Sequence, residues 1–356
     1  MDLTKYQTGC TYQEIIRQQE IWRTALSSLL GQRSLHGQWL KEFKDHVWVF
    51  SGCGTSYYLA QTGACLFEMI TGFRTRAVPA SEILTYPQLV FNPHDRHLLV
   101  AISRSGTTTE ILRAAQKVKK ELHLPVLSIS CDSQSPMAQE GDHKLIFPFP
   151  SEQSVVMTGS FTTMLFSIVY LALQAGADEG SLAKLKQVAH VSQKFMQKNE
   201  AAIAEIAAAK TSDFVFLAQG PFVGLANEAS LKIKEMSISS SVSFHALEFR
   251  HGPMSIVTGD TLITVLLSAG GHSYELQLAR DLKKLGARLL LLHSADGSIA
   301  DNPADFVFQV PSGYGDLFNS FLYMPLLQLL GYYYARSKGI NPDKPKNLTA
   351  VVTLND

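Results

Sequence analysis

Short apolar runs alternate with helix-like segments along most of the chain, and the runs form two series. The first series predicts strands at residues 46–52, 97–103, 125–131 and 143–149. The second series predicts strands at residues 213–220, 261–268, 288–294 and 305–310. Continuous apolar strands separated by helices are typical of parallel sheets covered on both faces. The pattern therefore predicts an α/β protein with two doubly wound parallel-sheet domains, each a three-layer α-β-α sandwich.

Helical periodicity fills the rest of the chain. Residues 12–40 predict a helical N-terminal segment, and residues 317–338 predict a long helix that ends at Gly339. The longest apolar run, residues 161–177, is interrupted by hydroxyl and amide side chains, so we expect a buried helix instead of a membrane span. Residues 341–356 contain two prolines and are expected to run extended as a tail that folds back over a cleft.

Three features recur at a nearly constant offset of about half the chain. Gly54 and Gly220 each follow the first strand of a series, Ser103 and Ser268 begin small-residue loops after a later strand, and PVLSIS matches RLLLLHS. A constant offset favours internal duplication of one α/β unit over chance similarity of two α/β domains. We expect a boundary near residues 195–212, with four parts: an N-terminal helical segment at 1–40, a first domain at 41–195, a second at 210–340, and the tail at 341–356.

Composition narrows the class of protein. The 356 residues contain 31 basic and 31 acidic side chains, so no net charge favours a nucleic-acid or membrane partner. The cysteines show no C-x-x-C spacing and are expected to be reduced thiols; they are Cys10, Cys53, Cys65 and Cys131. The N-terminus has no signal-peptide pattern. We expect a cytoplasmic protein that needs no metal or other cofactor.

Two loops of the first series combine small residues with hydroxyls at a helix entry: SGCGTS, which contains Gly54, Thr55 and Ser56, and SRSGTTTE, which begins at Ser103. Backbone N–H groups at helix starts and Ser/Thr hydroxyls suit phosphate oxygens, and Arg104 can add a charge-assisted contact. Neither loop is a Walker or dinucleotide motif, so a small phosphorylated ligand is favoured. The alternative is that these hydroxyls only cap helices. The second series lacks them.

The segment 227–253 carries acids, an amine and an imidazole. Glu228, Lys232 and Glu235 share one face of a predicted helix, at the border of its apolar stripe, where burial can shift their pKa values. His251 follows in an RHGP turn. Such groups in one cleft could transfer protons on a sugar. An ordinary helix ion pair and a turn histidine are the alternatives.

Together these motifs, with EASLKIKE, HGP and the NPDKPKNL tail, resemble the sugar isomerase (SIS) domain family in its two-domain, flavodoxin-like form. The chain is most similar to the isomerase half of glutamine–fructose-6-phosphate amidotransferase and to stand-alone amino-sugar-6-phosphate deaminases. EFRHGP is also similar to the corresponding turn of tagatose-6-phosphate isomerase-like members and fructosamine-6-phosphate deglycases.

The resemblance implies roles for matching residues. Glu235 would move a proton between C1 and C2, and His251 would assist ring opening, often from the neighbouring subunit of a homodimer. Lys232 would contact sugar hydroxyls and tune Glu235, with Glu228 orienting Lys232. The phosphate site implied by the family, with Thr55 and Gly106 in its loops, comprises Ser56, Ser103, Ser105 and Thr108.

Three positions depart from the family. Ala350 replaces a tail lysine that approaches the sugar, and Arg104 replaces a glutamine. Met157 stands where serine is frequent, and Thr158 is expected to compensate as a phosphate ligand. These changes bear on the identity of the substrate.

We expect no glutaminase domain, so transfer from glutamine is not the expected reaction. The leading hypothesis is a hexosamine-6-phosphate deaminase/isomerase that releases ammonia. Two alternatives stay open: a ketose/aldose-phosphate isomerase or fructosamine-6-phosphate deglycase, and a non-catalytic sugar-phosphate sensor. The expected partners are a sugar phosphate and a second copy of the chain, without nucleic acid or membrane.

Overall fold

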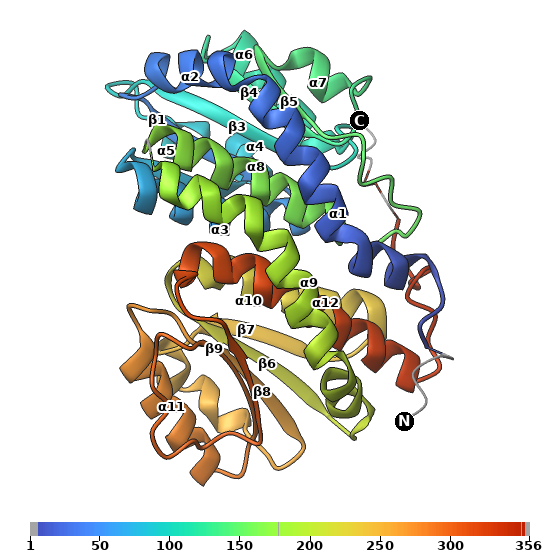
Figure 1. Ribbon diagram of the computed structural model, residues 1–356. Coiled ribbons are helices and arrows are strands. Elements are labelled where there is room, and N and C mark those ends of the chain that lie inside the picture. Colours follow the sequence, from blue (N-terminus) through green and yellow to red (C-terminus); the bar gives the residue numbers. More distant parts are fainter. Residues whose placement is uncertain (1–5, 177, 350, 353–356) are drawn as a thin grey trace. The chain divides into compact units, whose positions relative to one another are not determined.

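A computed structural model describes residues 6–176, 178–349 and 351–352. The chain divides into two compact units, each with its own five-stranded sheet (Figure 1). The β1–β5 unit contains the described residues of 17–152, 157–189 and 349–356. The β6–β10 unit contains the described residues of 1–16, 153–156 and 190–348.

The sheet of the β1–β5 unit has the order β2-β1-β3-β4-β5, and all its strands are parallel. Its strands are β1 (Val47–Gly52), β2 (Thr75–Pro79), β3 (His97–Ser103), β4 (Val126–Ser130) and β5 (His143–Ile146). The helices from the N-terminus to residue 208 are α1 (Cys10–Gly31), α2 (Arg33–Glu42), α3 (Thr55–Thr71), α4 (Ala80–Thr85), α5 (Pro87–Val90), α6 (Thr109–Lys120), α7 (Pro136–Glu140), α8 (Gly159–Ala175) and α9 (Glu179–Ala208).

Alternate residues of β1 face opposite sides of this sheet, as the pleat of a strand requires. Val47 and Val49 belong to the core that α4 and α6 cover. Trp48 and Phe50 point to the other face, where the ring of Phe67 on α3 lies 4.6 Å from that of Trp48, centroid to centroid. Both faces are therefore buried, which explains the continuous apolar runs in the sequence.

Helix α8 is the buried helix predicted for residues 161–177. Its residues from Gly159 to Leu173 are all buried, mainly against α3, and the Trp22 indole on α1 donates a hydrogen bond of 2.9 Å to the Thr162 hydroxyl. This packing explains why α8 is apolar on all sides. Within the described ranges, no helix combines the length and apolarity that a bilayer crossing needs.

The sheet of the β6–β10 unit has the order β10-β9-β8-β6-β7 and is also parallel. Its strands are β6 (Asp213–Ala218), β7 (Ser241–His245), β8 (Thr261–Leu266), β9 (Arg288–Ser294) and β10 (Phe306–Val310). Its α-helices after residue 208 are α10 (Val223–Ser237), α11 (His272–Lys284) and α12 (Gly315–Ser337). Three short 3₁₀ helices are η1 (Gly220–Phe222), η2 (Glu248–Arg250) and η3 (Pro253–Ile256). Helix α11 covers one face of the sheet, whereas α10 and α12 contact each other and the other face (Figure 1).

Both sheets have the same connectivity when strands are counted within each unit: second, first, third, fourth, fifth. This is the flavodoxin-like order of doubly wound folds. The predicted fold class is thereby confirmed, and the shared order supports internal duplication. The predicted helix at residues 317–338 matches α12 closely.

The sequence pattern missed β2 and β7. Each lies at an edge of its sheet, and most of its residues are only partly buried. The sequences of these two strands, TRAVP and SVSFH, interrupt the apolar residues with polar ones, whereas the other edge strands, β5 and β10, keep the short apolar runs that predicted them.

Two predicted segments differ in detail from the structure. The N-terminal helical segment consists of two helices, α1 and α2, and extends to Glu42. The stretch around residues 195–212 begins inside α9, a continuous helix that ends at Ala208. The limits of the predicted domains stay a prediction.

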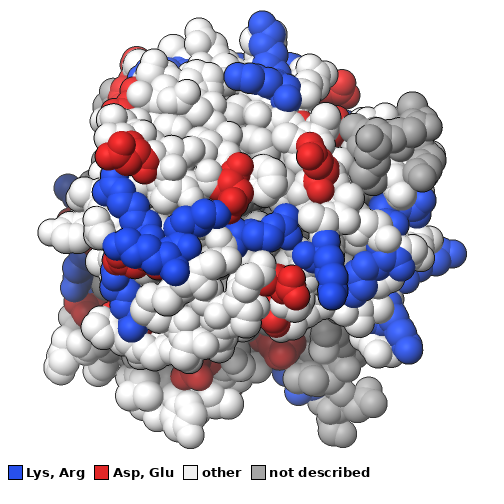
Figure 2. Space-filling view, turned by 90° about the horizontal axis from the view of Figure 1, so that it is seen from below, with Lys and Arg blue, Asp and Glu red and all other residues white. Residues whose placement is uncertain are grey.

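Charges of both signs are intermixed on one face of the molecule. On the face in Figure 2, acidic side chains lie between basic ones. Ion pairs of the β6–β10 unit, such as that between Lys283 and Asp305 at 2.6 Å, also place opposite charges side by side. Mixed charges of this kind contribute mainly to solvation, since exposed pairs stabilise a fold by only about 0–1 kcal/mol.

The buried imidazole of His36 predicts an acid-sensitive core in the β1–β5 unit. Its side chain packs between Trp39 and Tyr170, neither ring nitrogen has a hydrogen-bond partner among the described residues, and burial lowers its pKa to about 4. The unfolded chain takes up this proton near pH 6.5, so stability should fall as the pH drops from about 6.5 to about 4. At pH 5 this amounts to about 2 kcal/mol.

The variant His36→Leu should lose this part of the acid dependence. Urea unfolding at pH 7 and pH 5 measures it, and His94→Leu, at an exposed position, is the matched control. Equal losses of stability at pH 5 in the wild type and His36→Leu would contradict the prediction.

Candidate functional site

The first hydroxyl-bearing loop lies at the carboxyl end of β1. Gly54 has a φ of +53°, a left-handed conformation that glycine adopts without strain, and it leads directly into α3. Thr55 and Ser56 open that helix and are both buried. The N-cap position is Gly54, so neither hydroxyl serves as the N-cap side chain of α3.

The second loop lies at the carboxyl end of β3, the strand next to β1. The Gly106 N–H donates to the Ser103 hydroxyl at 3.0 Å, and the Thr107 N–H and hydroxyl donate to the Ser105 hydroxyl at 3.2 and 3.0 Å. A hydroxyl that accepts a hydrogen bond can still donate its own proton to a phosphate oxygen. Thr108 is the N-cap residue of α6, but its side chain makes no capping hydrogen bond.

These two loops meet the requirements of an anion site. They follow β1 and β3, where the strand order reverses, and ligands of doubly wound sheets bind at such a switch point. Helices α3 and α6 both begin there, so their positive ends add to the hydroxyl donors. Helix capping, the alternative explanation, accounts for neither Thr108 nor the α3 hydroxyls.

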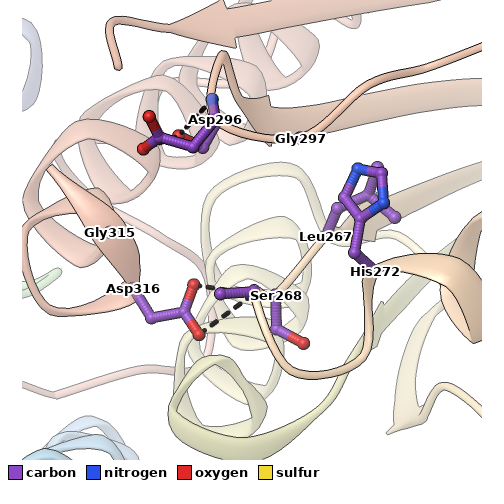
Figure 3. A pocket seen from close by; sticks show the side chains of 9 residues that line it. Leu267, Ser268, His272, Asp296, Gly297, Gly315 and Asp316 are labelled. Atoms are coloured by element: carbon purple, nitrogen blue, oxygen red, sulfur yellow. Dashed lines mark hydrogen bonds between the residues drawn. The ribbon is translucent and has the colours of Figure 1, made fainter. Parts of the chain in front are cut away.

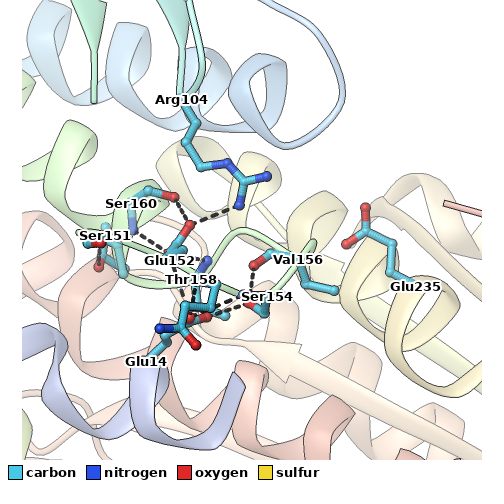
Figure 4. Close-up of polar contacts among 12 residues, drawn as sticks. Glu14, Arg104, Ser151, Glu152, Ser154, Val156, Thr158, Ser160 and Glu235 are labelled. Carbon is cyan, nitrogen blue, oxygen red and sulfur yellow. Dashed lines mark hydrogen bonds and ion pairs between the residues drawn. The ribbon is translucent and has the colours of Figure 1, made fainter. Parts of the chain in front are cut away.

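Arg104, placed between Ser103 and Ser105, contacts a carboxylate that the sequence did not single out. Its Nη1 lies 3.0 Å from Oε2 of Glu152, whose side chain is 2% exposed. Oε1 of Glu152 accepts from the N–H and hydroxyl of Thr158, and the N–H and hydroxyl of Ser160 also donate to Glu152 (Figure 4). Glu152 thus occupies the N-terminus of α8. An isolated acid shortly before a helix start was the only hint in the sequence.

Thr158, predicted as a phosphate ligand, therefore directs its N–H and hydroxyl to Glu152. The neighbouring Met157 is partly buried. The role of Thr158 toward phosphate stays a prediction.

On α10 of the other unit, the structure brings Glu228, Lys232 and Glu235 together. Lys232 Nζ lies 3.2 Å from Oε1 of Glu228 and forms a second ion pair with Glu235. Glu228 and Lys232 are fully buried, whereas the side chain of Glu235 is 15% exposed. Lys234, between them in sequence, is exposed.

The charged face of α10 lies deeper than the border position predicted for it. Helix α12 packs against α10, and a Cβ at Gly331 would lie 3.4 Å from the backbone of Lys232. Burial alone would lower the pKa of Lys232, but the Glu228 and Glu235 carboxylates outweigh it and raise the pKa. A surface ion pair is thereby excluded.

A buried ammonium between two carboxylates contributes little net stability, because the cost of removing the charges from water offsets their attraction. Buried clusters of ionisable groups are more frequent at functional sites than in the rest of a protein. Glu235 is the member that solvent reaches.

His251 lies in the turn after η2 and is exposed. Its N–H donates to the carbonyl of Glu248, and the adjacent Arg250 forms an ion pair of 2.8 Å with Asp281. Gly252 follows with a φ of +118°, which requires glycine. Within the described residues the imidazole makes no hydrogen bond or ion pair, so it is available to a ligand or a partner.

The loop after β8 is the counterpart of the Ser103 loop. The Gly271 N–H donates to the Ser268 hydroxyl at 3.0 Å, just as Gly106 does to Ser103. Two other N–H groups of the loop are taken by carboxylates. Ala269 N–H donates to Asp316 at 2.9 Å (Figure 3), and Ser268 N–H donates to Glu275 at 2.7 Å. Burial, with the nearby Asp316 charge, raises the pKa of Glu275 to about 7.

A cavity of about 140 Å³ adjoins this loop and is lined in part by His272, Asp296 and Asp316 (Figure 3). Its acidic lining, and the carboxylates on the loop N–H groups, make it unsuited to a phosphate.

The tail has turns but no helix or strand at residues 341–349. Asp343 accepts hydrogen bonds from the N–H groups of Cys10 and Thr11, at the start of α1. The Val352 carbonyl lies 3.4 Å from the Thr109 N–H, in the first turn of α6. Ala350, where the family carries a lysine, lies outside the described residues, and closure of the tail over the site stays a prediction.

The family model of the SIS domain matches residues 44–174 and 208–332. The chain therefore belongs to the SIS domain family, and the resemblance seen in the sequence is confirmed. Among solved structures, glucosamine-6-phosphate deaminase from Thermotoga maritima is 30% identical, with a TM-score of 0.81, over 97% of this chain and 100% of that one.

Tagatose-6-phosphate ketose/aldose isomerase from Escherichia coli has a TM-score of 0.86 at 24% identity, over 98% of this chain and 96% of that one. The isomerizing glutamine–fructose-6-phosphate aminotransferase of Methanothermobacter thermautotrophicus is 30% identical over 309 residues, 86% of this chain and 51% of its own length. The chain thus spans about half the length of the curated relatives it matches. The relatives named here are enzymes.

Proposed function

We propose that the protein is a hexosamine-6-phosphate deaminase/isomerase. The observation that carries this proposal is the Glu228–Lys232–Glu235 cluster on α10, in which one solvent-reached carboxylate is held by a buried ammonium. The hydroxyl loops after β1 and β3 support a phosphorylated substrate. The deaminase from Thermotoga maritima, 30% identical over nearly the whole chain, favours an amino sugar.

In the proposed reaction, the ring of a 2-amino-2-deoxyaldose 6-phosphate opens with the help of His251. The Glu235 carboxylate takes the proton from C2 and returns it to C1, so the C1–C2 enolamine becomes a C2 ketimine. Water adds to C2 and ammonia leaves, giving a ketose 6-phosphate. Lys232 holds Glu235 in place and is itself held by Glu228.

We further propose that the phosphate is bound by the hydroxyls of Ser56, Ser103, Ser105 and Thr108, with Thr55, Gly54 and Gly106 shaping the loops. Arg104 and Thr158 border this site. His251 would come from the partner subunit of a homodimer, which its exposure in the single chain supports. No cofactor is needed for this chemistry. The free thiols of all four cysteines fit a cytoplasmic protein.

The second candidate is an aldose–ketose isomerase without deamination, or a fructosamine-6-phosphate deglycase. The same carboxylate serves each reaction, because each passes through an enol-type intermediate. A sugar-phosphate sensor is the candidate from another class. The buried charge cluster of α10 argues against a sensor, since binding alone would not require it.

Incubation of the purified protein with a panel of sugar phosphates tests these proposals. We expect ammonia from glucosamine 6-phosphate or galactosamine 6-phosphate. Conversion of tagatose 6-phosphate or fructosamine 6-phosphate, without ammonia from either hexosamine, would favour the second candidate. A sugar phosphate that binds in D₂O without deuterium uptake at C1 or C2 would favour a sensor.

Replacement of Ser105 tests the phosphate site. Ser105→Ala should raise KM for the sugar phosphate about tenfold and leave kcat nearly unchanged, since a phosphate contact persists from ground state to transition state. Initial-rate kinetics measure both constants, and Ser273→Ala, at an exposed position on α11, is the control. A loss confined to kcat would exclude Ser105 as a phosphate ligand.

A further inference from the structure

In both units a carboxylate connects the loop after the third strand to the helix that follows the fifth strand. In the β1–β5 unit, Glu152 joins Arg104, the residue after Ser103, to the first turn of α8. In the β6–β10 unit, Asp316 in the first turn of α12 accepts from the N–H of Ala269, the residue after Ser268. The duplicated fold therefore repeats this connection, although different residues make it.

Hydrogen-bond donors surround the carboxylate of Glu152. Five donor groups converge on its carboxylate: the Arg104 guanidinium at 3.0 Å, the Thr158 N–H at 2.9 Å and hydroxyl at 3.2 Å, and the Ser160 N–H at 2.8 Å and hydroxyl at 2.6 Å (Figure 4). Its side chain is 2% exposed, and that of Arg104 is 16% exposed. One buried carboxylate thus neutralises both the guanidinium and the positive end of α8.

Arg104 is fixed at its backbone as well. Its carbonyl accepts from the N–H of Cys131 at 3.0 Å and from the hydroxyl of Ser130 at 3.3 Å, both at the end of β4. With the side chain held by Glu152, Arg104 has little freedom to move. Ser103 and Ser105, two of the proposed phosphate ligands, flank it directly.

We infer that Glu152 is a positioning residue for phosphate recognition: it fixes Arg104, and through Arg104 the hydroxyls of the Ser103 loop, in the geometry that a sugar phosphate requires. This inference rests on the proposed function. Glu152 acts through its neighbours and takes no part in proton transfer.

Two effects of removing its charge oppose each other. Without Glu152 the site gains a net positive charge, which by itself would tighten phosphate binding. The loop would also lose its anchor, because a glutamine amide presents two donors to a ring of donors and leaves part of that ring unsatisfied. Positioning dominates if the loop must be preorganised to bind, and the sign of the change in KM distinguishes the two effects.

The experiment compares Glu152→Gln with Asp316→Asn, the equivalent change in the unit without the hydroxyl loops. We expect Glu152→Gln to raise KM for the hexosamine 6-phosphate, and Kd for glucitol 6-phosphate, about tenfold, with kcat within about twofold. Asp316→Asn should leave both constants unchanged. Arg104→Met should raise KM, but much less when Glu152→Gln is already present, since the two residues act as one unit.

A lower KM in Glu152→Gln would show that its charge repels phosphate, and equal effects of Arg104→Met in both backgrounds would show that Glu152 does not act through Arg104. Either result overturns the inference. If Glu152→Gln does not fold, Glu152→Asp provides the comparison, because it keeps the charge and should show a smaller rise in KM. Failure of the wild-type protein to bind any sugar phosphate would instead refute the proposed function.

Discussion

Glu235→Gln is expected to lower kcat for ammonia release by about a thousandfold. The amide keeps the size of the side chain but cannot accept a proton from C2, and positioned proton transfer contributes about 10²- to 10⁴-fold to such rates. Binding should survive, because the phosphate loops belong to other elements. Steady-state kinetics and the Kd of glucitol 6-phosphate measure the two effects separately.

Lys234→Met on the same helix is the control, since its side chain is exposed and lies outside the cluster. Glu235→Gln should also abolish deuterium exchange at C2 of the substrate. Wild-type turnover in this variant would remove Glu235 from the mechanism. A parallel loss of glucitol 6-phosphate binding would indicate a binding role instead.

Lys232→Met is expected to have the second largest effect, with kcat/KM reduced by at least about a hundredfold and a marked loss of stability. The variant leaves the Glu228 and Glu235 carboxylates close together without their ammonium, and breaking a buried ion pair typically costs about 3–5 kcal/mol. Two neighbouring carboxylates resist holding two negative charges, so one would bind a proton at a higher pH. The acid limb of the pH–rate profile should therefore move to higher pH.

Lys234→Met again provides the control and should change the free energy of unfolding by no more than about 0.5 kcal/mol. Adding Glu228→Gln to Lys232→Met removes the second carboxylate and should bring the acid limb back toward lower pH. If Lys232→Met lowers activity but leaves the acid limb of the pH–rate profile in place, Lys232 contacts the sugar and does not tune Glu235.

Strands buried on both faces were predictable because burial demands an uninterrupted apolar run, as in VWVF of β1 and LLVAI of β3. Strands β2 and β7 were not, since polar residues interrupt the apolar ones in TRAVP and SVSFH. The other two edge strands, β5 and β10, keep short apolar runs and were predicted. The constant spacing predicted internal duplication of one α/β unit, and the strand order shared by the two sheets supports it. Local pattern therefore predicted the strands that carry an apolar run and missed the two edge strands that lack one.

The candidate site was likewise predicted only in part: its local motifs were found, and its tertiary contacts were not. Helical spacing placed Glu228, Lys232 and Glu235 on one face, but only tertiary packing against α12 buries the first two. Arg104 was recognised from its neighbours in the loop. Its partner Glu152 is far from it in sequence, and such long-range pairing leaves no local pattern to find.

The identical closure of the Ser103 and Ser268 loops has an evolutionary consequence. After a tandem duplication, each copy inherits the same backbone requirement, so the Gly271–Ser268 contact shows what the turn needs merely to form. Arg104 and the hydroxyls around it are then what the first copy adds to this shared turn. The second copy therefore serves as an internal comparison that separates what the turn needs to form from what the first copy adds to it.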